Sequence, residues 1–283
     1  MSQIVVTGAT GHLGHLVVEH LLDRRVPAET ITATGRSLDK VADLAERGVR
    51  TAAVDFEDPA TIAPALGSGD VLVLVSSSAV GRRTPQHRNV VDAAVQAGVA
   101  RVVYTSIPKA DSTPMLLAQE HRETEELLAA SGLPVTLLRN AWYVENYSAQ
   151  APTYLEHGMV GAAGDGLVSI APRSEYAEAA AVVASADGHE GKVYELGGEA
   201  VTMSELASLF SDALGQQITY TDVDEATLRG ILEGAGLGPA AAVFADVDSR
   251  VRAGDLHVTS GHLGELLGRT PTSAKQAVLD AVR

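Results

Sequence analysis

The chain has 283 residues, of which 46% are hydrophobic, and 21 basic and 36 acidic side chains give it a net charge of −15. This length and composition exclude a disordered chain and fit one large folded domain or two smaller ones. The acidity argues against a nucleic-acid partner, because phosphate affinity comes from clustered lysine and arginine. The absence of cysteine excludes disulfides, thiolate zinc sites, iron–sulfur clusters and a thiol nucleophile.

The charge is spread unevenly along the chain. Residues 1–142 carry 13 basic and 16 acidic side chains, whereas residues 143–283 carry 8 and 20. One explanation is an acidic surface that keeps the second half solvated. The other is that the nearly neutral first half accommodates an anion.

No segment resembles a targeting signal or a membrane anchor. Met1–Gln3 leads directly into the apolar residues Ile4–Val6, without a basic leader or a cleavage site. The longest apolar stretches, such as Val71–Val75, are far too short to span a bilayer. We therefore expect a cytoplasmic protein that is not inserted into a membrane.

Short apolar strands alternate with amphipathic helices as far as Arg139. The predicted strands are Ile4–Thr7, Ile31–Thr34, Thr51–Val54, Val71–Val75, Arg101–Thr105 and Pro134–Arg139. Helical patterns lie between them, including Lys40–Arg47, Gln86–Ala97 and Leu117–Ala130. This alternation is typical of βαβ units. It predicts an α/β fold with a Rossmann-type parallel sheet, helices on both faces and strand order 3-2-1-4-5, with further strands at the edge.

The alternation becomes irregular after Arg139. Helices are expected over Tyr147–His157, Tyr176–Ala184 and Glu205–Leu214, and a strand near residues 192–197 is expected to return to the sheet. The stretch from Gln216 to Pro271 has short helical pieces between glycines and no clear order. We predict a Rossmann domain over residues 1–142 and a smaller C-terminal α/β lobe over residues 143–283 that binds a substrate.

A glycine-rich loop lies between the first strand and the first helix. Glycines at positions 8, 11 and 14 leave room for a sharp turn and for a close approach of phosphate to the backbone. The alternative is a simple tight turn, but the strand–loop–helix context favours a dinucleotide. The residues expected to bind its pyrophosphate are Gly8, Ala9, Thr10, Gly11, His12 and Leu13.

The residue after the second strand indicates which dinucleotide binds. NAD-specific sites place an acid there to hold the ribose hydroxyls. This chain has Arg36 and no acid before Asp39. A guanidinium suits a phosphate, so Arg36 predicts a preference for NADPH. The alternative is that Arg36 forms an exposed salt bridge.

The ends of the third and fourth strands are expected to face the same ligand, because ligands bind at the carboxyl ends of parallel strands. Asp55 and Phe56 end the third strand, where an adenine ring would lie. Val75, Ser76 and Ser77 end the fourth, where the cofactor riboses would lie. These serines are equally compatible with a simple polar turn.

The usual proton donor of ketone reductases is absent. Hydride addition to a ketone generates a basic alkoxide, which short-chain dehydrogenases protonate with a tyrosine paired to a lysine four residues later. None of the seven tyrosines has lysine at that position. No nucleophile-elbow motif is present, and the pair His12 and His15 lacks a further metal ligand, so no metal site is expected.

The absence of this proton donor limits the kinds of substrate that the protein could reduce. A quinone that accepts hydride becomes an aromatic phenolate, a weak base that can take its proton from water. The same absence would suit a sensor that binds NADP without turnover. Both hypotheses remain open on the residues alone.

Several stretches resemble the NmrA-like atypical short-chain dehydrogenases, and among them the bacterial type 2 NAD(P)H:quinone oxidoreductases. The most specific are the Pro85–Val90 sequence Pro-Gln-His-Arg-Asn-Val and the Arg139–Tyr143 sequence Arg-Asn-Ala-Trp-Tyr. The resemblance covers nearly the whole chain. Other matching stretches are Thr7–His15, Ser76–Ser78, Tyr104–Ser106, Glu120–Glu125, Glu145–Tyr147, Gly161–Gly166 and His189–Leu196.

The resemblance implies a flavin-free enzyme that passes hydride from NADPH to a small-molecule quinone. It places Tyr104, Thr105 and Asn140 among the cofactor-binding residues. It also places Asn140, Trp142 and Tyr143 at the quinone; for Trp142 the alternative is a core aromatic, and the functional role is a flat wall against the ring.

The resemblance also singles out His121 as the candidate catalytic residue. This histidine stands where extended members of the superfamily carry their active-site lysine. It is expected to shuttle a proton, to order the cofactor or simply to pack.

We therefore predict an NADPH-dependent quinone oxidoreductase without flavin or metal. The alternative is a non-catalytic NADP-binding redox sensor of the NmrA type, and an isomerase on the same fold ranks third. The partner is a small-molecule quinone rather than nucleic acid or a membrane. A homo-oligomer is left open.

Overall fold

The computed structural model describes residues 3–283 and divides into two compact units. The first unit comprises Met1–Ile107, Glu120–Arg139 and Ser174–Tyr194. The second comprises Pro108–Gln119, Asn140–Arg173 and Glu195–Arg283. The units thus interleave along the chain, whereas the expected domains were residues 1–142, joined by a returning strand near residues 192–197, and residues 143–283.

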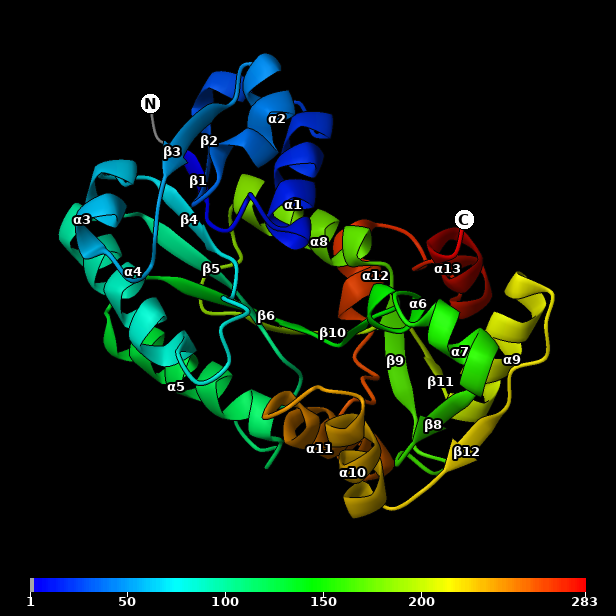
Figure 1. The fold of residues 1–283 in the computed structure, drawn as a ribbon. Helices are drawn as coiled ribbons and strands as arrows, with labels where there is room; N and C mark the ends of the chain where they lie inside the picture. Colours follow the sequence, from blue (N-terminus) through cyan, green and yellow to red (C-terminus); the bar gives the residue numbers. More distant parts are fainter. Residues whose placement is uncertain (1–2) are drawn as a thin grey trace. The chain divides into compact units, whose positions relative to one another are not determined.

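The first unit is built on a seven-stranded sheet (Figure 1). Its strand order is β10-β6-β5-β4-β1-β2-β3. The predicted order 3-2-1-4-5 is confirmed, and the strand expected near residues 192–197 forms one edge. The strands are β1 (Ile4–Val6), β2 (Ile31–Gly35), β3 (Arg50–Ala53), β4 (Val71–Leu74), β5 (Arg101–Ser106), β6 (Val135–Asn140) and β10 (Val193–Leu196).

Parallel pairing brings the carboxyl ends of these strands to one edge of the sheet. In the register of β1, Ile4 lies opposite Ile31 of β2 and Val71 of β4. The pairs β2–β3, β4–β5 and β5–β6 are also parallel. The loops that follow β1 to β6 therefore leave the sheet at the same edge, where ligands of this fold class bind.

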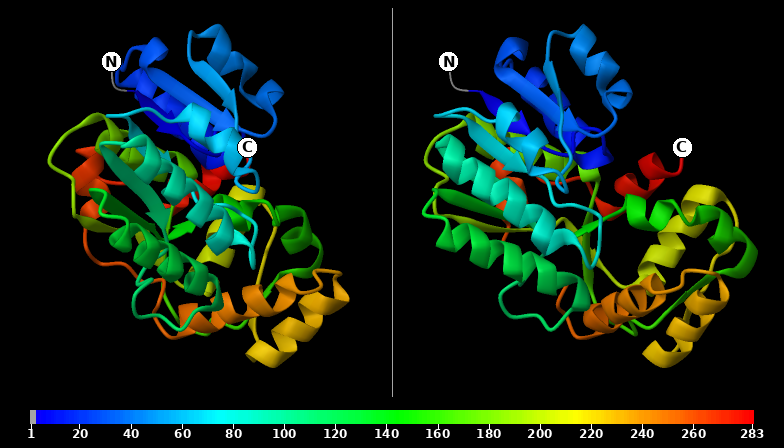
Figure 2. Two further views of the ribbon diagram at one scale, coloured as in Figure 1. Left: turned by 90° about the vertical axis from the view of Figure 1, so that its left-hand side faces the viewer. Right: turned by 60° about the vertical axis from the view of Figure 1, so that its left-hand side comes forward.

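Helices cover both faces of this sheet (Figures 1 and 2). On one face α1 (His12–Asp23) lies beside α8 (Arg173–Ser185), where Arg24 Nε donates to Ser185 Oγ at 3.0 Å. On the other face α4 (Arg83–Ala97) lies beside α5 (Leu116–Ala130). Buried aliphatic side chains such as Leu72, Val90 and Leu128 form one core cluster, which fixes α4 and α5 on the sheet. Shorter helical segments complete the unit: η1 (Ala28–Thr30), η2 (Leu38–Val41), α2 (Ala42–Glu46), α3 (Pro59–Ile62) and η3 (Ala63–Ala65).

The second unit holds two small sheets and the remaining helices. Its strands are β7 (Trp142–Tyr143), β8 (Met159–Gly161), β9 (Val168–Ala171), β11 (Glu199–Val201) and β12 (Tyr220–Asp222), paired as β11-β9-β7 and β12-β8. Its helices are α6 (Glu145–Ser148), α7 (Ala151–His157), α9 (Met203–Leu214), α10 (Glu225–Gly234), α11 (Ala240–Arg252), α12 (His262–Leu267) and α13 (Ala274–Ala281).

Two expected helices have different bounds in the structure. The helix expected over Tyr147–His157 is split into α6 and α7, because a proline follows the first residue of α7 and a proline within a helix interrupts its hydrogen bonds. Helix α4 begins at Arg83 rather than at Gln86, since Pro85 falls in its first turn, where proline is tolerated. None of the helices in the described residues 3–283 is long and apolar enough to cross a membrane.

Candidate functional site

The glycine-rich loop forms a tight connection between β1 and α1. Gly8 has a φ of +63°, a left-handed conformation that favours glycine. A Cβ on Gly14 would collide with the Gly8 carbonyl, so the loop and the helix pack without space for a side chain. Gly11 caps α1 without a side-chain bond, and the first turn has no acidic residue. The amides of His12 and Leu13 are thus oriented for an anion.

Arg36 follows β2 directly and is exposed. A Cβ on Gly35, the residue before it, would overlap the side chain of Thr10, so the end of β2 packs against the glycine loop. No carboxylate in residues 3–283 forms an ion pair with the Arg36 guanidinium, which excludes the exposed salt bridge within that range. This cation is therefore available to a ligand phosphate.

The loops after β3 and β4 are both tied to the start of α4. The Asn89 side-chain amide donates to the Phe56 carbonyl at 2.8 Å. Ser77 Oγ donates to Gln86 Oε1 at 2.5 Å, and Gln86 Nε2 donates to a Glu57 carboxylate oxygen at 2.9 Å. One glutamine thus connects the two loops that hold the predicted adenine and ribose residues.

His87 fixes the backbone of the second loop. The Ser77 N–H donates to His87 Nε2 at 3.0 Å, so the ring proton lies on Nδ1, which is 2.9 Å from Thr124 Oγ1. Burial, together with the charge of Arg83, lowers the pKa of His87 to about 3. His87 is therefore neutral near pH 7 and acts as a hydrogen-bond acceptor.

Arg83 and Glu120 complete this support. Arg83 Nε donates to the Ser77 carbonyl at 2.7 Å, and the Glu120 carboxylate accepts the backbone N–H groups of Gly81 and Arg83 at 2.9 and 2.8 Å. The sequence did not identify these side chains as part of the site. Glu120 begins the Glu120–Glu125 stretch, which carried the family resemblance without an assigned role, whereas no pattern in the sequence marked Arg83.

The remaining residues of the first unit that were predicted to bind the cofactor lie at the same strand ends. The Val75 N–H donates to Thr7 Oγ1 at 3.0 Å, and the Ser76 N–H donates to Thr105 Oγ1 at 2.9 Å. Asp55 Oδ1 accepts the Glu57 N–H at 3.0 Å, which closes the turn after β3. The structure thus brings Val75, Ser76 and Thr105 together, while Asp55 shapes its own loop.

Tyr104 and His121 form a buried pair behind these loops. Tyr104 is fully buried, His121 is 5% exposed, and the Tyr104 hydroxyl lies 2.8 Å from His121 Nδ1. Burial lowers the pKa of His121, and the nearby Arg83 and His87 contribute to this decrease. Burial raises the pKa of Tyr104. Both side chains are neutral near pH 7, which favours an ordering role for His121 over a proton shuttle.

In the second unit, Asn140 and Tyr143 contact each other. The Asn140 side-chain nitrogen lies 3.3 Å from the Tyr143 hydroxyl. Asn140 is 3% exposed, and its Oδ1 has no hydrogen-bond partner within the described chain. A buried amide oxygen without a partner is unfavourable, and a ligand that carries an N–H or O–H group would satisfy it.

Trp142 and Tyr143 form β7 next to Asn140. They pair in parallel with Ile170 and Ala171 of β9. Both aromatic side chains are partly exposed, so Trp142 is not a fully buried core residue. Of the two, the structure brings the Tyr143 side chain into contact with Asn140.

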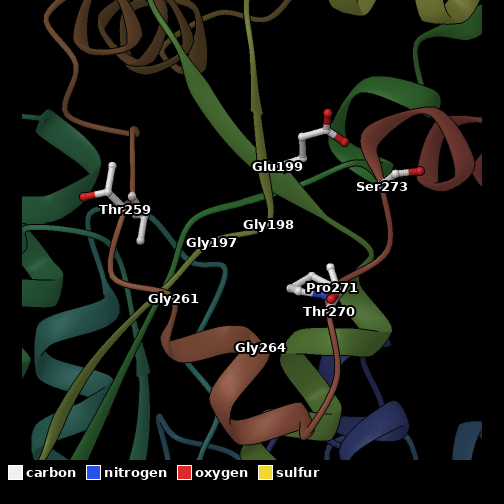
Figure 3. Close-up of a pocket in the computed structure, with 10 residues that line it drawn as sticks. Gly197, Gly198, Glu199, Thr259, Gly261, Gly264, Thr270, Pro271 and Ser273 are labelled. Carbon is white, nitrogen blue, oxygen red and sulfur yellow. The ribbon is translucent and has the colours of Figure 1, made fainter.

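The second unit also contains a cavity of about 380 Å³ (Figure 3). The turn through Gly197 and Gly198 lies along it, with Thr259 and Ser273 on opposite sides. The Glu199 carboxylate beside it accepts the Ala274 N–H at 2.7 Å. None of the residues predicted from the sequence lines this cavity. Over residues 3–283, no cluster of three or more histidine, aspartate or glutamate side chains could hold a metal ion.

Comparison with known proteins identifies close relatives. The model of the NmrA-like family matches residues 1–247. Quinone oxidoreductase 2 of Escherichia coli is 46% identical over 278 residues, which cover 97% of each chain.

Solved structures agree with this relationship. The crystal structure of an NADPH-dependent quinone oxidoreductase from E. coli, complexed with NADPH, superposes with a TM-score of 0.95 and covers 99% of this chain and 100% of its own. A triphenylmethane reductase of Citrobacter complexed with NADP(H) is 34% identical with a TM-score of 0.91, over 99% of this chain and 100% of its own.

Proposed function

The chain belongs to the NmrA-like family, and we propose that it is an NADPH-dependent quinone oxidoreductase that transfers hydride without flavin or metal. The observation that carries this proposal is the 46% identity to a quinone oxidoreductase over 97% of both chains. The proposal includes a cytoplasmic location, which cell fractionation would test.

The first unit supplies the groups that fit NADPH. The amides at the start of α1 would hold the pyrophosphate, and Arg36, which has no ion-pair partner within residues 3–283, would hold the 2′-phosphate. Phe56 and Asp55 would lie at the adenine, and Ser76, Ser77 and Thr105 would lie along the riboses. When bound, NADPH supplies the hydride, and the protein supplies its orientation.

The second unit supplies groups that fit the nicotinamide and the quinone. The buried Asn140 oxygen would accept a hydrogen bond from the nicotinamide carboxamide or from the product hydroxyl. Trp142 and Tyr143 would provide flat walls for an aromatic ring. The protein has no tyrosine–lysine pair, which suits a quinone because its reduction produces a weakly basic phenolate.

Turnover of a quinone tests this proposal. Purified protein is mixed with NADPH and either benzoquinone or menadione, and the loss of reduced nicotinamide is followed by absorbance. We expect enzyme-dependent loss that is faster with NADPH than with NADH. Tight NADP binding without any enzyme-dependent loss would instead support the redox-sensor alternative.

A further inference from the structure

Arg173 is a cation beside Tyr143, one of the aromatic residues of the proposed quinone site. Its guanidinium carbon lies 5.1 Å from the centroid of the Tyr143 ring. The residue is partly exposed, and no carboxylate among residues 3–283 forms an ion pair with its guanidinium. It is the only lysine or arginine in residues 140–173. Its charge is therefore not neutralised by a direct partner.

The backbone N–H of Arg173 is held by a carboxylate. Both carboxylate oxygens of Glu145 accept the Arg173 N–H, at 2.9 and 3.0 Å. Glu145 thus caps the first residue of α8 instead of pairing with the guanidinium. Tyr143 pairs in register with Ala171, the last residue of β9, and Arg173 follows two residues later as the first residue of α8.

The reaction creates a charge that this site has to accommodate. The quinone gains two electrons and one hydrogen nucleus as hydride, the nicotinamide is oxidised, and the product is a hydroquinone monoanion that later takes a proton from water. The neighbouring side chains cannot supply that proton readily. Burial raises the pKa of Tyr143, although Asn140 and Arg173 oppose this shift. The Asn140 side chain is an amide and cannot act as a proton donor to the anion.

The geometry points to Arg173 as a catalytic residue that stabilises the hydroquinone anion electrostatically. This inference rests on the proposed function. A guanidinium beside a ring that acquires negative charge lowers the barrier, because the interaction is stronger in the transition state than with the neutral quinone. The charge of Arg173 stabilises the anion that a proton donor would otherwise neutralise.

A series of substituted benzoquinones provides the kinetic test. Arg173→Gln removes the charge, Arg173→Met retains the apolar stem, and Arg173→Lys retains a charge. The matched control is Arg229→Gln, which changes an exposed arginine of α10 in the same unit. We expect Arg173→Gln to reduce kcat on the order of tenfold, below the roughly hundredfold effect of removing a buried oxyanion donor. The loss should be largest for methylated quinones, whose hydroquinones are most basic, and smallest for chlorinated quinones.

A binding measurement tests the same charge without turnover. 4-Nitrophenol mimics the product anion, and the absorbance of its phenolate is followed against pH in the presence of the NADP⁺-loaded protein. Wild-type protein and Arg173→Lys should lower the pKa of the bound phenol, whereas Arg173→Gln and Arg173→Met should not.

The outcomes separate this inference from the proposed function. Wild-type turnover of quinones tests the function alone. Equal loss for all quinones in the Arg173 variants would indicate a structural role, and a weaker Kd for NADPH with no dependence on the quinone would indicate a cofactor ligand. Either result, or unchanged kinetics with an unchanged phenol pKa, would overturn the role of Arg173.

Discussion

Arg36 is the single side chain on which the cofactor preference is expected to depend. It is exposed at the carboxyl end of β2 and has no ion-pair partner among the described residues. Arg36→Glu should lower the ratio of kcat/KM with NADPH to kcat/KM with NADH at least tenfold, or about 1.4 kcal/mol, because the new carboxylate repels a 2′-phosphate. The matched control is Arg50→Glu, an exposed charge reversal at the amino end of β3. A ratio that changes equally in both variants would contradict the role of Arg36.

We expect the Asn140 side chain to increase activity without stabilising the fold. Its buried Oδ1 has no partner in the described chain, so removal of the amide relieves an unsatisfied group. Asn140→Ala should therefore lower kcat/KM for the quinone by about tenfold or more while Tm is unchanged or higher. Asn146→Ala is the control in the same unit. Equal loss of activity and Tm in Asn140→Ala would show that the residue is structural.

Asp248 should make the stability of the protein depend on pH. It accepts the Ala162 N–H at 2.9 Å, and burial raises the pKa of its carboxyl to about 6, with a contribution from Asp222. Between the unfolded value near 4 and about 6, the native state binds more protons, so the free energy of unfolding falls as pH rises. The loss from this group is about 3 kcal/mol. In denaturant titrations, Asp248→Asn should flatten the curve of the free energy of unfolding against pH in this range. An unchanged slope of that curve would contradict the role of Asp248.

At the scale of elements, the start of α4 supports the cofactor loops. Gln86, His87 and Asn89 bind the loops after β3 and β4, whereas Arg88 on the same helix is exposed. His87→Phe removes the acceptor of the Ser77 N–H and leaves a buried donor unsatisfied. We expect KM for NADPH to rise about tenfold with a smaller change in kcat, since the loop positions the cofactor rather than the reacting atoms.

The control for this prediction is Arg88→Gln, which leaves all three contacts intact. His87→Gln offers an amide acceptor and should recover part of the affinity. Isothermal titration with NADPH measures the Kd directly. Equal affinities for His87→Phe and the wild type would show that α4 does not support the cofactor loops.

Elements with a strong local signal could be predicted from the sequence. The strand order, the glycine loop and the place of Arg36 follow from alternating apolar runs and a loop that opens a helix. The contacts of His87 with Ser77 and Thr124 could not, because they join residues that only the folded sheet brings together. Short helical pieces were expected between Gln216 and Pro271, but their bounds could not be predicted, since several glycines weaken helical propensity there and caps such as Asp224 decide the boundaries.

At the scale of the whole molecule, the chain returns twice to each unit. Residues 174–194 rejoin the first unit and residues 108–119 belong to the second. Local patterns predicted that a strand near residues 192–197 returns to the sheet, but they carry no signal for the placement of residues 108–119 or of helix α8. The cofactor groups of the first unit come from the part of the sequence with nearly balanced charge, whereas residues 143–283 carry 8 basic and 20 acidic side chains. This distribution suits a polyanionic cofactor and a neutral quinone.

The central claim is direct transfer of hydride from NADPH to a quinone. It is tested most directly by stopped-flow oxidation of NADPH by menadione, with protein shown by its absorbance spectrum to contain no flavin. NADPH that carries deuterium at the transferred position is compared with ordinary NADPH. We predict enzyme-dependent formation of the hydroquinone that is slower with deuterium. Formation without an isotope effect would contradict hydride transfer as the measured step, and the absence of enzyme-dependent oxidation, despite NADPH binding, would contradict the enzymatic function itself.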